Sequence, residues 1–262
     1  MKIRCQASAL ALVFLVSPAH AELKTAEEID ACYQANFPET TAIQTISMNA
    51  KDRIGAITTT KSTLWWKKME DGKSNVMMQF FKPAEMRNAG LLMLERDDGT
   101  DMFIYLPELA RVKRVTSRMT SSSMFGTDFS YEEFERLQGI AESAPSERLP
   151  DDTIEGRPAY VLETRPGPED DSAYERIKTW IDKETCVSLK SEFYERGDKP
   201  RKVMFVRTDK ITREGNLWVP REIVMHDHRD ETETVMVVEK IEIGVDISRS
   251  RFSQSQLERT GR

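Results

Sequence analysis

Hydrophobic and polar residues change their spacing once near the start of the chain, from a period near four to a period of two. Apolar residues from Ile29 to Phe37 recur at helical spacing, and they follow a capping box that Thr25 and Glu28 form. Pro38 ends this helix, because the residue before a proline disfavours the helical conformation. We therefore expect one amphipathic helix ahead of a region of strands.

From residue 45 onward, apolar and polar residues alternate in short runs, which is typical of half-buried strands. Turn residues such as Asp71-Gly72 and Gly197-Asp198 separate these runs. The proline-containing stretches at 145–150 and 166–168 are expected to be loops. The runs predict strands at 45–50, 56–68, 75–82, 91–96, 101–106, 111–116, 159–165, 174–182, 187–196, 202–210, 217–227 and 232–247.

The last run, 232–247, has the longest alternation. Val235, Val237, Ile241 and Ile243 are predicted to share one face, interrupted only by Glu239. Many long antiparallel strands with an accumulating twist do not remain flat. We therefore predict a mainly β fold whose sheet curls into a barrel or a half barrel with a concave face.

The segment 121–139 interrupts the strand pattern. Ser130 and Glu133 form a second capping box, and Phe129 with Phe134 forms a hydrophobic staple, so a short helix is expected over 131–137. Two interpretations stay open: a lid over the mouth of the concavity, or a helix that plugs it permanently. Its apolar side chains, which must dock on something, are Met124, Phe125, Phe129, Phe134 and Leu137.

Several strands in the middle of the chain are apolar on both faces and rich in methionine. The flexible methionine side chain suits a surface that accepts variable apolar shapes, although it fills a core equally well. We take Met77, Met93, Met102 and Ile104 as candidate lining residues of a ligand cavity.

The formal net charge of −6 argues against nucleic acid as a partner. Four cations nevertheless cluster before the interrupting segment, at Arg111, Lys113, Arg114 and Arg118. They are candidates for contact with an anionic lipid head group or an acidic patch of a partner. The alternative is a solvated edge strand that charge protects against pairing.

The start of the sequence is typical of a secretory signal peptide. Lys2 and Arg4 precede an apolar run over 7–16, and an A-x-A site ends at Ala21. We therefore expect a signal peptide at 1–21 and a single exported domain at 22–262. Cys32 and Cys186 remain after cleavage; they either form a disulfide, which persists outside the cytoplasm, or stay independent.

Motifs for catalysis are weak. No G-x-S-x-G, P-loop or H-E-x-x-H pattern occurs, and no cofactor is expected. His226, His228 and Asp230 share one face of a strand and could bind zinc, but the polar stretch around them favours a solvated strand end. We therefore expect a binding protein with no catalytic or metal site, and not an enzyme.

Three stretches together carry a family resemblance: MFIYLPELARVKRV at 102–115, SSSMFGTDFSYEEF at 121–134 and WIDKETCVSLKSEFYERG at 180–197. The chain resembles the LolA-like outer-membrane lipoprotein-sorting protein family over nearly all of its expected mature length. The resemblance implies a strongly curved antiparallel sheet that forms an unclosed half barrel, with an N-terminal helix and a lid or plug helix near 130–138.

The same resemblance implies a hydrophobic cavity and a periplasmic location. The implied activity is transfer of a lipid or an acylated lipoprotein between membranes, with transient membrane contact. It also implies an inner-membrane transporter of the RND or MMPL type as a partner. The alternative is an accessory protein that docks on such a transporter and never carries cargo.

Overall fold

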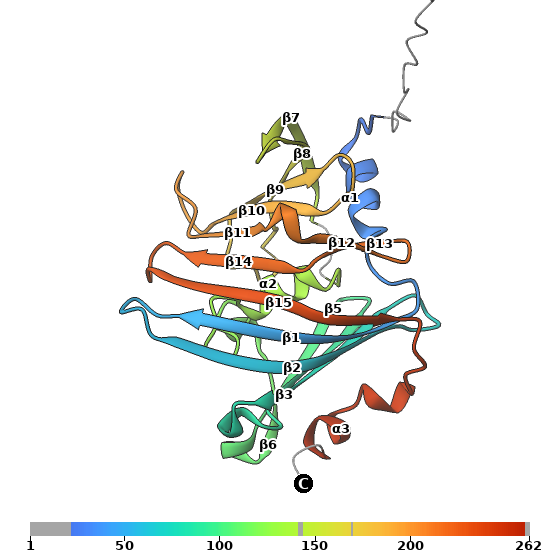
Figure 1. The fold of residues 1–262 in the computed structure, drawn as a ribbon, viewed down its shortest axis with the longest axis vertical. Coiled ribbons are helices and arrows are strands. Elements are labelled where there is room, and N and C mark those ends of the chain that lie inside the picture. The colour runs from blue at the N-terminus through green and yellow to red at the C-terminus, as the bar shows by residue number, and fades with distance from the viewer. Residues whose placement is uncertain (1–21, 141–143, 169, 260–262) are drawn as a thin grey trace, which may run out of the picture.

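The computed structural model describes residues 22–140, 144–168 and 170–259, so the expected signal peptide at 1–21 lies outside the described residues. The described chain forms one antiparallel sheet of 13 strands in the order β6-β5-β4-β3-β2-β1-β15-β14-β11-β10-β9-β8-β7, together with a two-stranded sheet, β12-β13. Figure 1 shows the large sheet curving around α2. Its edge strands β6 and β7 do not pair with each other, which confirms the predicted unclosed half barrel.

The strands of the first half of the sheet are joined by short hairpins. They are β1 (Thr41–Lys51), β2 (Ile57–Lys68), β3 (Ser74–Lys82), β4 (Gly90–Arg96), β5 (Gly99–Leu106) and β6 (Arg111–Arg114). The second half contains β7 (Ser146–Ile154), β8 (Arg157–Thr164), β9 (Arg176–Asp182), β10 (Ser188–Tyr194), β11 (Lys202–Val206), β14 (Glu222–Asp227) and β15 (Thr232–Ile243), and the small sheet contains β12 (Ile211–Glu214) and β13 (Leu217–Pro220).

Within the described residues, three α-helices accompany the sheet: α1 (Ala26–Gln34), α2 (Tyr131–Leu137) and α3 (Gln254–Arg259). Both predicted capping boxes are present, Thr25 with Glu28 at α1 and Ser130 with Glu133 at α2. Helix α3 is not predicted by the sequence analysis. Short 3₁₀ helices lie at η1 (Ala84–Met86), η2 (Pro107–Leu109), η3 (Ser117–Met119), η4 (Thr208–Lys210) and η5 (Arg249–Arg251).

Strand β7 occupies the stretch that we predicted to be a loop, so that prediction is wrong. Its Pro150 lies in an edge strand, where a missing backbone N–H breaks no ladder hydrogen bond on the open side. The pairing of β7 with β8 shifts register between Leu149 and Asp152, which places the proline in a bulge. Proline alone therefore does not exclude a strand at the edge of a sheet.

Three predicted strands near the C-terminus differ from the structure. The predicted strand 202–210 ends at Val206, and η4 follows it. The predicted strand 217–227 divides into β13, which pairs with β12, and β14, which joins the large sheet. The predicted strand 232–247 ends at Ile243. Glu239 is an extra residue in the pairing with β1, so it moves Met236 and Val238 to the face of Ile241, and our predicted face for this strand is wrong.

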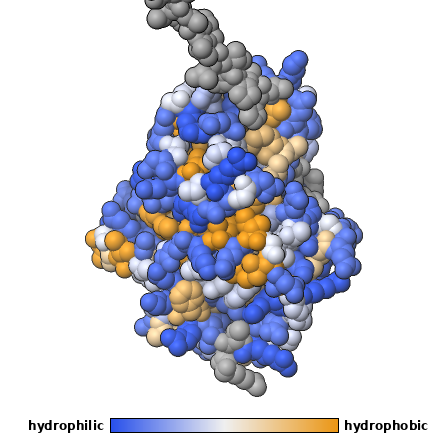
Figure 2. All heavy atoms as spheres, turned by 45° about the vertical axis from the view of Figure 1, so that its right-hand side comes forward, coloured by the Kyte–Doolittle hydropathy of each residue, from blue (hydrophilic) through white to orange (hydrophobic). Residues whose placement is uncertain are grey.

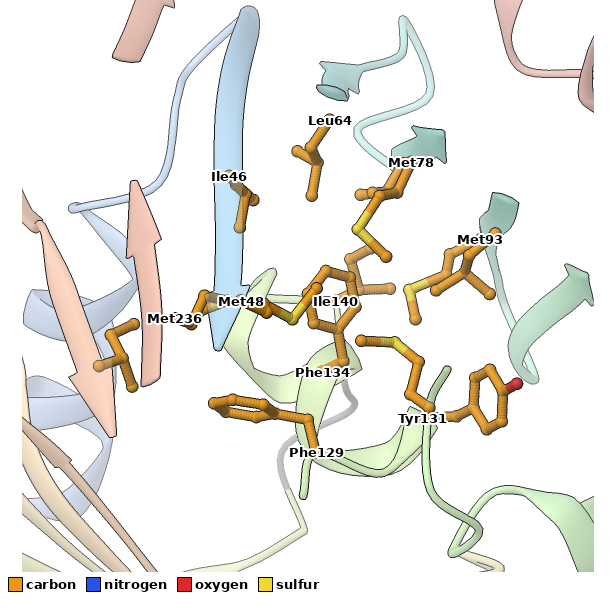
Figure 3. Close-up of a cluster of buried hydrophobic side chains, with 14 of the residues drawn as sticks. Ile46, Met48, Leu64, Met78, Met93, Phe129, Tyr131, Phe134, Ile140 and Met236 are labelled. Carbon is orange, nitrogen blue, oxygen red and sulfur yellow. The ribbon is translucent and has the colours of Figure 1, made fainter. Parts of the chain in front are cut away.

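The core lies on both faces of the sheet. On the concave face, buried residues from both halves of the sheet pack against the segment around α2 (Figure 3), which is possible only because the sheet wraps around it. On the opposite face, Met77, Leu92 and Tyr105 pack under the C-terminal residues Phe252 and Leu257. The concave face is therefore the place where a ligand site could be enclosed.

Candidate functional site

Helix α2 and the loop before it fill the middle of the concave face. Met124, Phe129 and Phe134 are fully buried there. Figure 3 shows methionine side chains from the sheet, including Met48 and Met93, converging on the two aromatic rings. Protein interiors of this kind are close-packed and leave little free volume. In this conformation the segment is a plug of the half barrel.

A buried ion pair fixes the plug to the sheet. The Glu133 carboxylate accepts hydrogen bonds from the Ser130 backbone N–H at 2.7 Å, from Lys202 Nζ at 3.0 Å and from the Tyr174 hydroxyl. Lys202 Nζ also donates to the Asp128 carbonyl oxygen at 2.7 Å. Glu133 is 1% exposed and Lys202 is 7% exposed, so each charge depends on the other for compensation. We call Glu133, Lys202 and Tyr174 the α2 anchor.

Tyr174, the third member of the α2 anchor, is a hydrogen-bond donor over the physiological pH range. Burial raises the pKa of Tyr174, and the negative charge of Glu133 raises it further. The hydroxyl therefore keeps its proton at neutral pH and donates a hydrogen bond to Glu133. The anchor is complete only while Tyr174 stays neutral.

A strand and a loop also hold the plug. The Asp128 backbone N–H donates to Thr234 Oγ1 at 2.9 Å, and the same hydroxyl donates to Asp128 Oδ2 at 2.6 Å. Glu132 accepts hydrogen bonds from the Ser172 hydroxyl at 2.5 Å and from the Ala173 backbone N–H at 3.1 Å. These contacts join the segment to β15 and to the loop before β9.

The structure places most of the predicted cavity residues in this packed interior. Met93, Met102, Ile104, Met124, Phe129 and Phe134 belong to the concave cluster. Phe125 packs on that cluster with its ring 4.7 Å from the ring of Phe80, while Met77 lies on the opposite face of the sheet. The open apolar space of the concave face lies elsewhere.

That space is a groove at the mouth of the half barrel, with a volume of about 110 Å³. It lies between the end of α1, the end of α2, the β12–β13 hairpin and strands β11, β14 and β15. Its lining is mostly apolar and includes Phe37, Trp66, Leu137, Met204, Trp218 and Ile241. Figure 2 shows apolar side chains gathered on this side of the molecule, at the level of β15 and the β12–β13 hairpin. We call it the apolar groove.

A single amide side chain holds one wall of the apolar groove in place. Asn36, just after α1, accepts a hydrogen bond from the Trp218 backbone N–H at 3.0 Å and donates to the Thr185 carbonyl oxygen at 2.6 Å. Nearby, Trp66 Nε1 donates to the Gln138 carbonyl oxygen at 3.1 Å. The groove is therefore assembled from elements that are distant in sequence.

A disulfide fastens α1 beside the groove. Cys32 and Cys186 are bonded, with their Cα atoms 5.5 Å apart and a sequence separation of 154. The bond ties α1 to the turn between β9 and β10, and Ile29 of the same helix packs on Tyr160 and Ile181. Because a disulfide restricts the unfolded chain, this bond stabilises the folded state.

A second space adjoins the apolar groove and differs from it in polarity. It has a volume of about 100 Å³ and lies between α1, α2 and strands β7 to β10. We call it the polar compartment, because its lining includes the hydroxyl groups of Ser146, Thr164, Thr179, Ser188 and Ser191. The two spaces are adjacent, because their linings share Tyr33, Leu137, Ser188 and Met204.

The predicted cation cluster lies apart from both spaces. Arg111, Lys113 and Arg114 form the edge strand β6, where Arg114 pairs with Asp101 at 2.6 Å, and Arg118 lies in η3. None of the four lines the apolar groove or the polar compartment. Arg114 instead borders a third space of about 470 Å³ whose lining is mainly polar.

Two searches over the described part of the chain found no candidate. None of the described helices has the length and apolar character that crossing a bilayer requires. Within the same residues, no group of three or more His, Cys, Asp or Glu side chains is arranged to hold a metal ion. In the histidine stretch, His226 Nδ1 lies 3.2 Å from a Glu233 carboxylate oxygen, and Asp230 pairs with Arg201 at 3.0 Å.

The chain matches a protein-family model described as "Uncharacterized protein" over residues 72–259. A comparison with curated proteins finds no match. Three solved structures are similar over most of the chain. A domain from Vibrio parahaemolyticus, assigned to the outer membrane lipoprotein-sorting proteins, is 23% identical with a TM-score of 0.79, and the match covers 88% of this chain and 97% of that one.

The other two structures match this chain over a similar share of its length. A DUF1329 family protein from Desulfovibrio piger is 20% identical with a TM-score of 0.81, covering 90% of this chain and 100% of that one. A LolA superfamily protein from Nitrosomonas europaea is 18% identical with a TM-score of 0.70, covering 89% of this chain and 100% of that one. At these identities the similarity establishes a shared fold.

Proposed function

The chain belongs to the family whose model matches residues 72–259 and has the LolA-like fold, and from this premise we propose that it binds lipid or acylated lipoprotein and transfers it between membranes. The cargo's acyl chain lies in the apolar groove. The proposed activity is binding and release, and no residue is assigned a catalytic role.

The observation that carries this proposal is the apolar groove itself. A group of aromatic and aliphatic side chains that is exposed to solvent is unfavourable unless a ligand or a partner covers it. Trp218 and Ile241 line the groove and are only partly buried. Each methylene group that enters such a site contributes about 0.8 kcal/mol, so eight of them contribute about 6 kcal/mol before entropy costs.

The size of the groove limits what this conformation can hold. Pockets that enclose drug-sized ligands have volumes of about 300 to 1,000 Å³. The apolar groove has about 110 Å³, so a complete long acyl chain requires it to widen. The β12–β13 hairpin is the wall that we expect to move, because it does not belong to the large sheet.

We place this activity in the periplasm, after cleavage of a signal peptide at 1–21, with 22–262 as one domain. The disulfide between Cys32 and Cys186 supports an oxidising compartment. Loading and release would occur during transient contact with a membrane or with a transporter of the RND or MMPL type. The four cations at 111–118 could make that contact through anionic head groups.

The first test is native mass spectrometry of mature protein purified from the periplasm without detergent. We expect a species whose added mass equals one lipid, which organic extraction then releases for identification. Protein that is always free of added mass, including after incubation with acyl probes, would contradict carriage.

The second test uses a matched pair of substitutions on β15. Ile241 lines the apolar groove, whereas Ile243 lies two residues further on the same face of the strand and does not line it. Ile241→Asp should lower the affinity for a fluorescent acyl probe about tenfold or more, because a carboxylate in an apolar site loses hydration. Ile243→Asp should leave the affinity unchanged. Equal effects of the two changes would show that the probe binds elsewhere.

A second candidate function rests on the plug. Because α2 and its loop fill the concave interior, the protein could be an accessory factor that docks on an RND or MMPL-type transporter without cargo. The same mass measurement separates the two functions. Empty protein that still binds the transporter in a pull-down of the purified pair would favour the accessory role.

A further inference from the structure

The polar compartment has a lining suited to a head group, and it lies directly beside the apolar groove. Four residues are shared by the two linings: Tyr33, Leu137, Ser188 and Met204. A ligand that occupied both spaces would have an apolar end and a hydrogen-bonding end. Because neither space is large, that ligand would have a single short chain or would occupy the site with part of a longer one.

Three hydroxyl groups of the polar compartment retain hydrogen-bonding capacity. Ser191 Oγ lies 3.3 Å from Thr179 Oγ1 and 3.4 Å from Ser188 Oγ, and no shorter hydrogen bond joins these three hydroxyls to one another. Hydroxyl groups that bond well to each other lie about 2.7 to 2.8 Å apart. Each hydroxyl can donate and accept, so the set suits a ligand that also carries hydroxyl groups.

The charges around the polar compartment are compensated and do not favour an anion. Glu133 pairs with Lys202 at 3.0 Å, and Arg136 pairs with Glu132 at 3.3 Å. Asp30 adds a further carboxylate to the same lining. A phosphate or carboxylate head group would therefore meet two carboxylates and one guanidinium that is already paired.

We propose that the polar compartment binds the uncharged, hydroxyl-bearing head group of a single-chain amphiphile, such as an acylglycerol, whose chain lies in the apolar groove. This inference rests on the proposed function, since it needs an acyl chain in the groove. It adds a preference among head groups that the groove alone does not supply.

The test compares ligands that share an eight-carbon chain, by isothermal titration calorimetry at pH 7.5 with the mature protein. Octanoylglycerol and octyl glucoside carry uncharged hydroxyl-bearing heads, whereas octanoate and octyl phosphate are anionic. We expect the uncharged pair to bind about tenfold more tightly, which corresponds to one or two additional hydrogen bonds. This comparison needs no substitution, so it stands even if a variant fails to fold.

Substitutions then locate the preference. Thr179→Val combined with Ser191→Ala should weaken octanoylglycerol about tenfold and leave octanoate unchanged, because both changes remove only hydroxyl groups. Thr63→Val is the matched control, since Thr63 lies on β2 and lines neither space. The control should alter neither ligand.

The outcomes separate this inference from the proposed function. Equal affinity for all four ligands, or tighter binding of the anionic pair, would overturn the head-group preference, while sensitivity to Ile241→Asp would still support the groove. Binding of none of the four would overturn both. Weakening of octanoylglycerol by the control as much as by the double change would also overturn the assignment to the polar compartment.

Discussion

The concave interior and the apolar groove at its mouth are built from similar side chains, yet they differ in what covers them. In the interior, Phe129 and Phe134 are fully buried under the chain's own sheet, and a buried ion pair fixes their segment. At the mouth, Trp218 and Ile241 remain partly exposed, and one amide, Asn36, holds the hairpin wall. The chain thus covers the apolar side chains of the interior itself, whereas the mouth presents apolar surface that can accept a ligand.

This difference implies that the interior contributes mainly to stability and the mouth mainly to ligand binding. Substitutions in the interior should lower the free energy of unfolding, because they disturb packing and buried charge. Substitutions of the partly exposed apolar residues at the mouth, such as Trp218 and Ile241, should alter ligand binding and leave the free energy of unfolding almost unchanged. The expected effects below run from the largest to the smallest.

The strongest effect should come from Phe129→Asp. The change removes a fully buried ring and leaves a carboxylate without a partner in the plug. We expect the free energy of unfolding, measured by urea denaturation, to fall by about 4 kcal/mol or more. Phe125→Asp is the control. Because Phe125 is only partly buried, this change should lower the free energy of unfolding by about half as much. Equal losses would mean that the segment is not fixed as described.

The α2 anchor should give the next largest effect. Lys202→Met leaves Glu133 buried without its counter-ion, and breaking such a pair costs about 3 kcal/mol. Lys61→Met provides the comparison, because Lys61 pairs with Glu239 on the surface and should lose less than about 1 kcal/mol. A Lys202→Met protein as stable as the Lys61→Met protein would show that the anchor contributes little.

The same anchor predicts a loss of stability at alkaline pH. Since burial and Glu133 raise the pKa of Tyr174 in the folded state, the unfolded state releases this proton first, near pH 10. The contribution of the protonated Tyr174 hydroxyl to stability is therefore present below pH 10 and falls above it, by about 1.4 kcal/mol per pH unit. The free energy of unfolding, measured by denaturation between pH 8 and 11, should decline less steeply for Tyr174→Phe than for the native sequence. Parallel curves would exclude Tyr174 as the source.

The wall of the apolar groove should respond more locally. Asn36→Ala removes two hydrogen bonds and should cost about 1 to 2 kcal/mol. Hydrogen exchange should accelerate at the amides of β12 and β13 and remain unchanged in β1 to β5. Asn49→Ala on β1, where Asn49 accepts one hydrogen bond from Thr59, serves as the control. Uniform acceleration across the whole sheet would contradict a locally held hairpin.

The fold could be predicted from the sequence to a large extent, because its signals are local. Alternation along the chain predicts most of the strands, and two capping boxes predict the starts of α1 and α2. The features that the sequence does not reveal depend on tertiary pairing. The extra residue Glu239 in β15 changes which side chains face inward, and no local pattern marks it as a bulge.

The candidate site was harder to predict for a related reason. The sequence identifies apolar residues such as Met93 and Phe134 but does not tell which of them the chain covers itself. The apolar groove is formed where Asn36, Leu137 and Trp218 meet, and these residues lie far apart in sequence. Trp218 in particular belongs to a predicted strand that the structure divides, so its role in a separate hairpin was not visible.

The central claim, that an acyl chain lies in the groove at the mouth and not beneath the plug, is tested most directly by photo-crosslinking. Octanoylglycerol with a diazirine at the end of its chain is irradiated with the mature protein, and the modified peptides are identified by mass spectrometry. We expect modification in the peptides that contain Trp218 and Ile241. Modification confined to the peptides that contain Met93, Met124 and Phe129 would place the chain inside the half barrel and contradict the account.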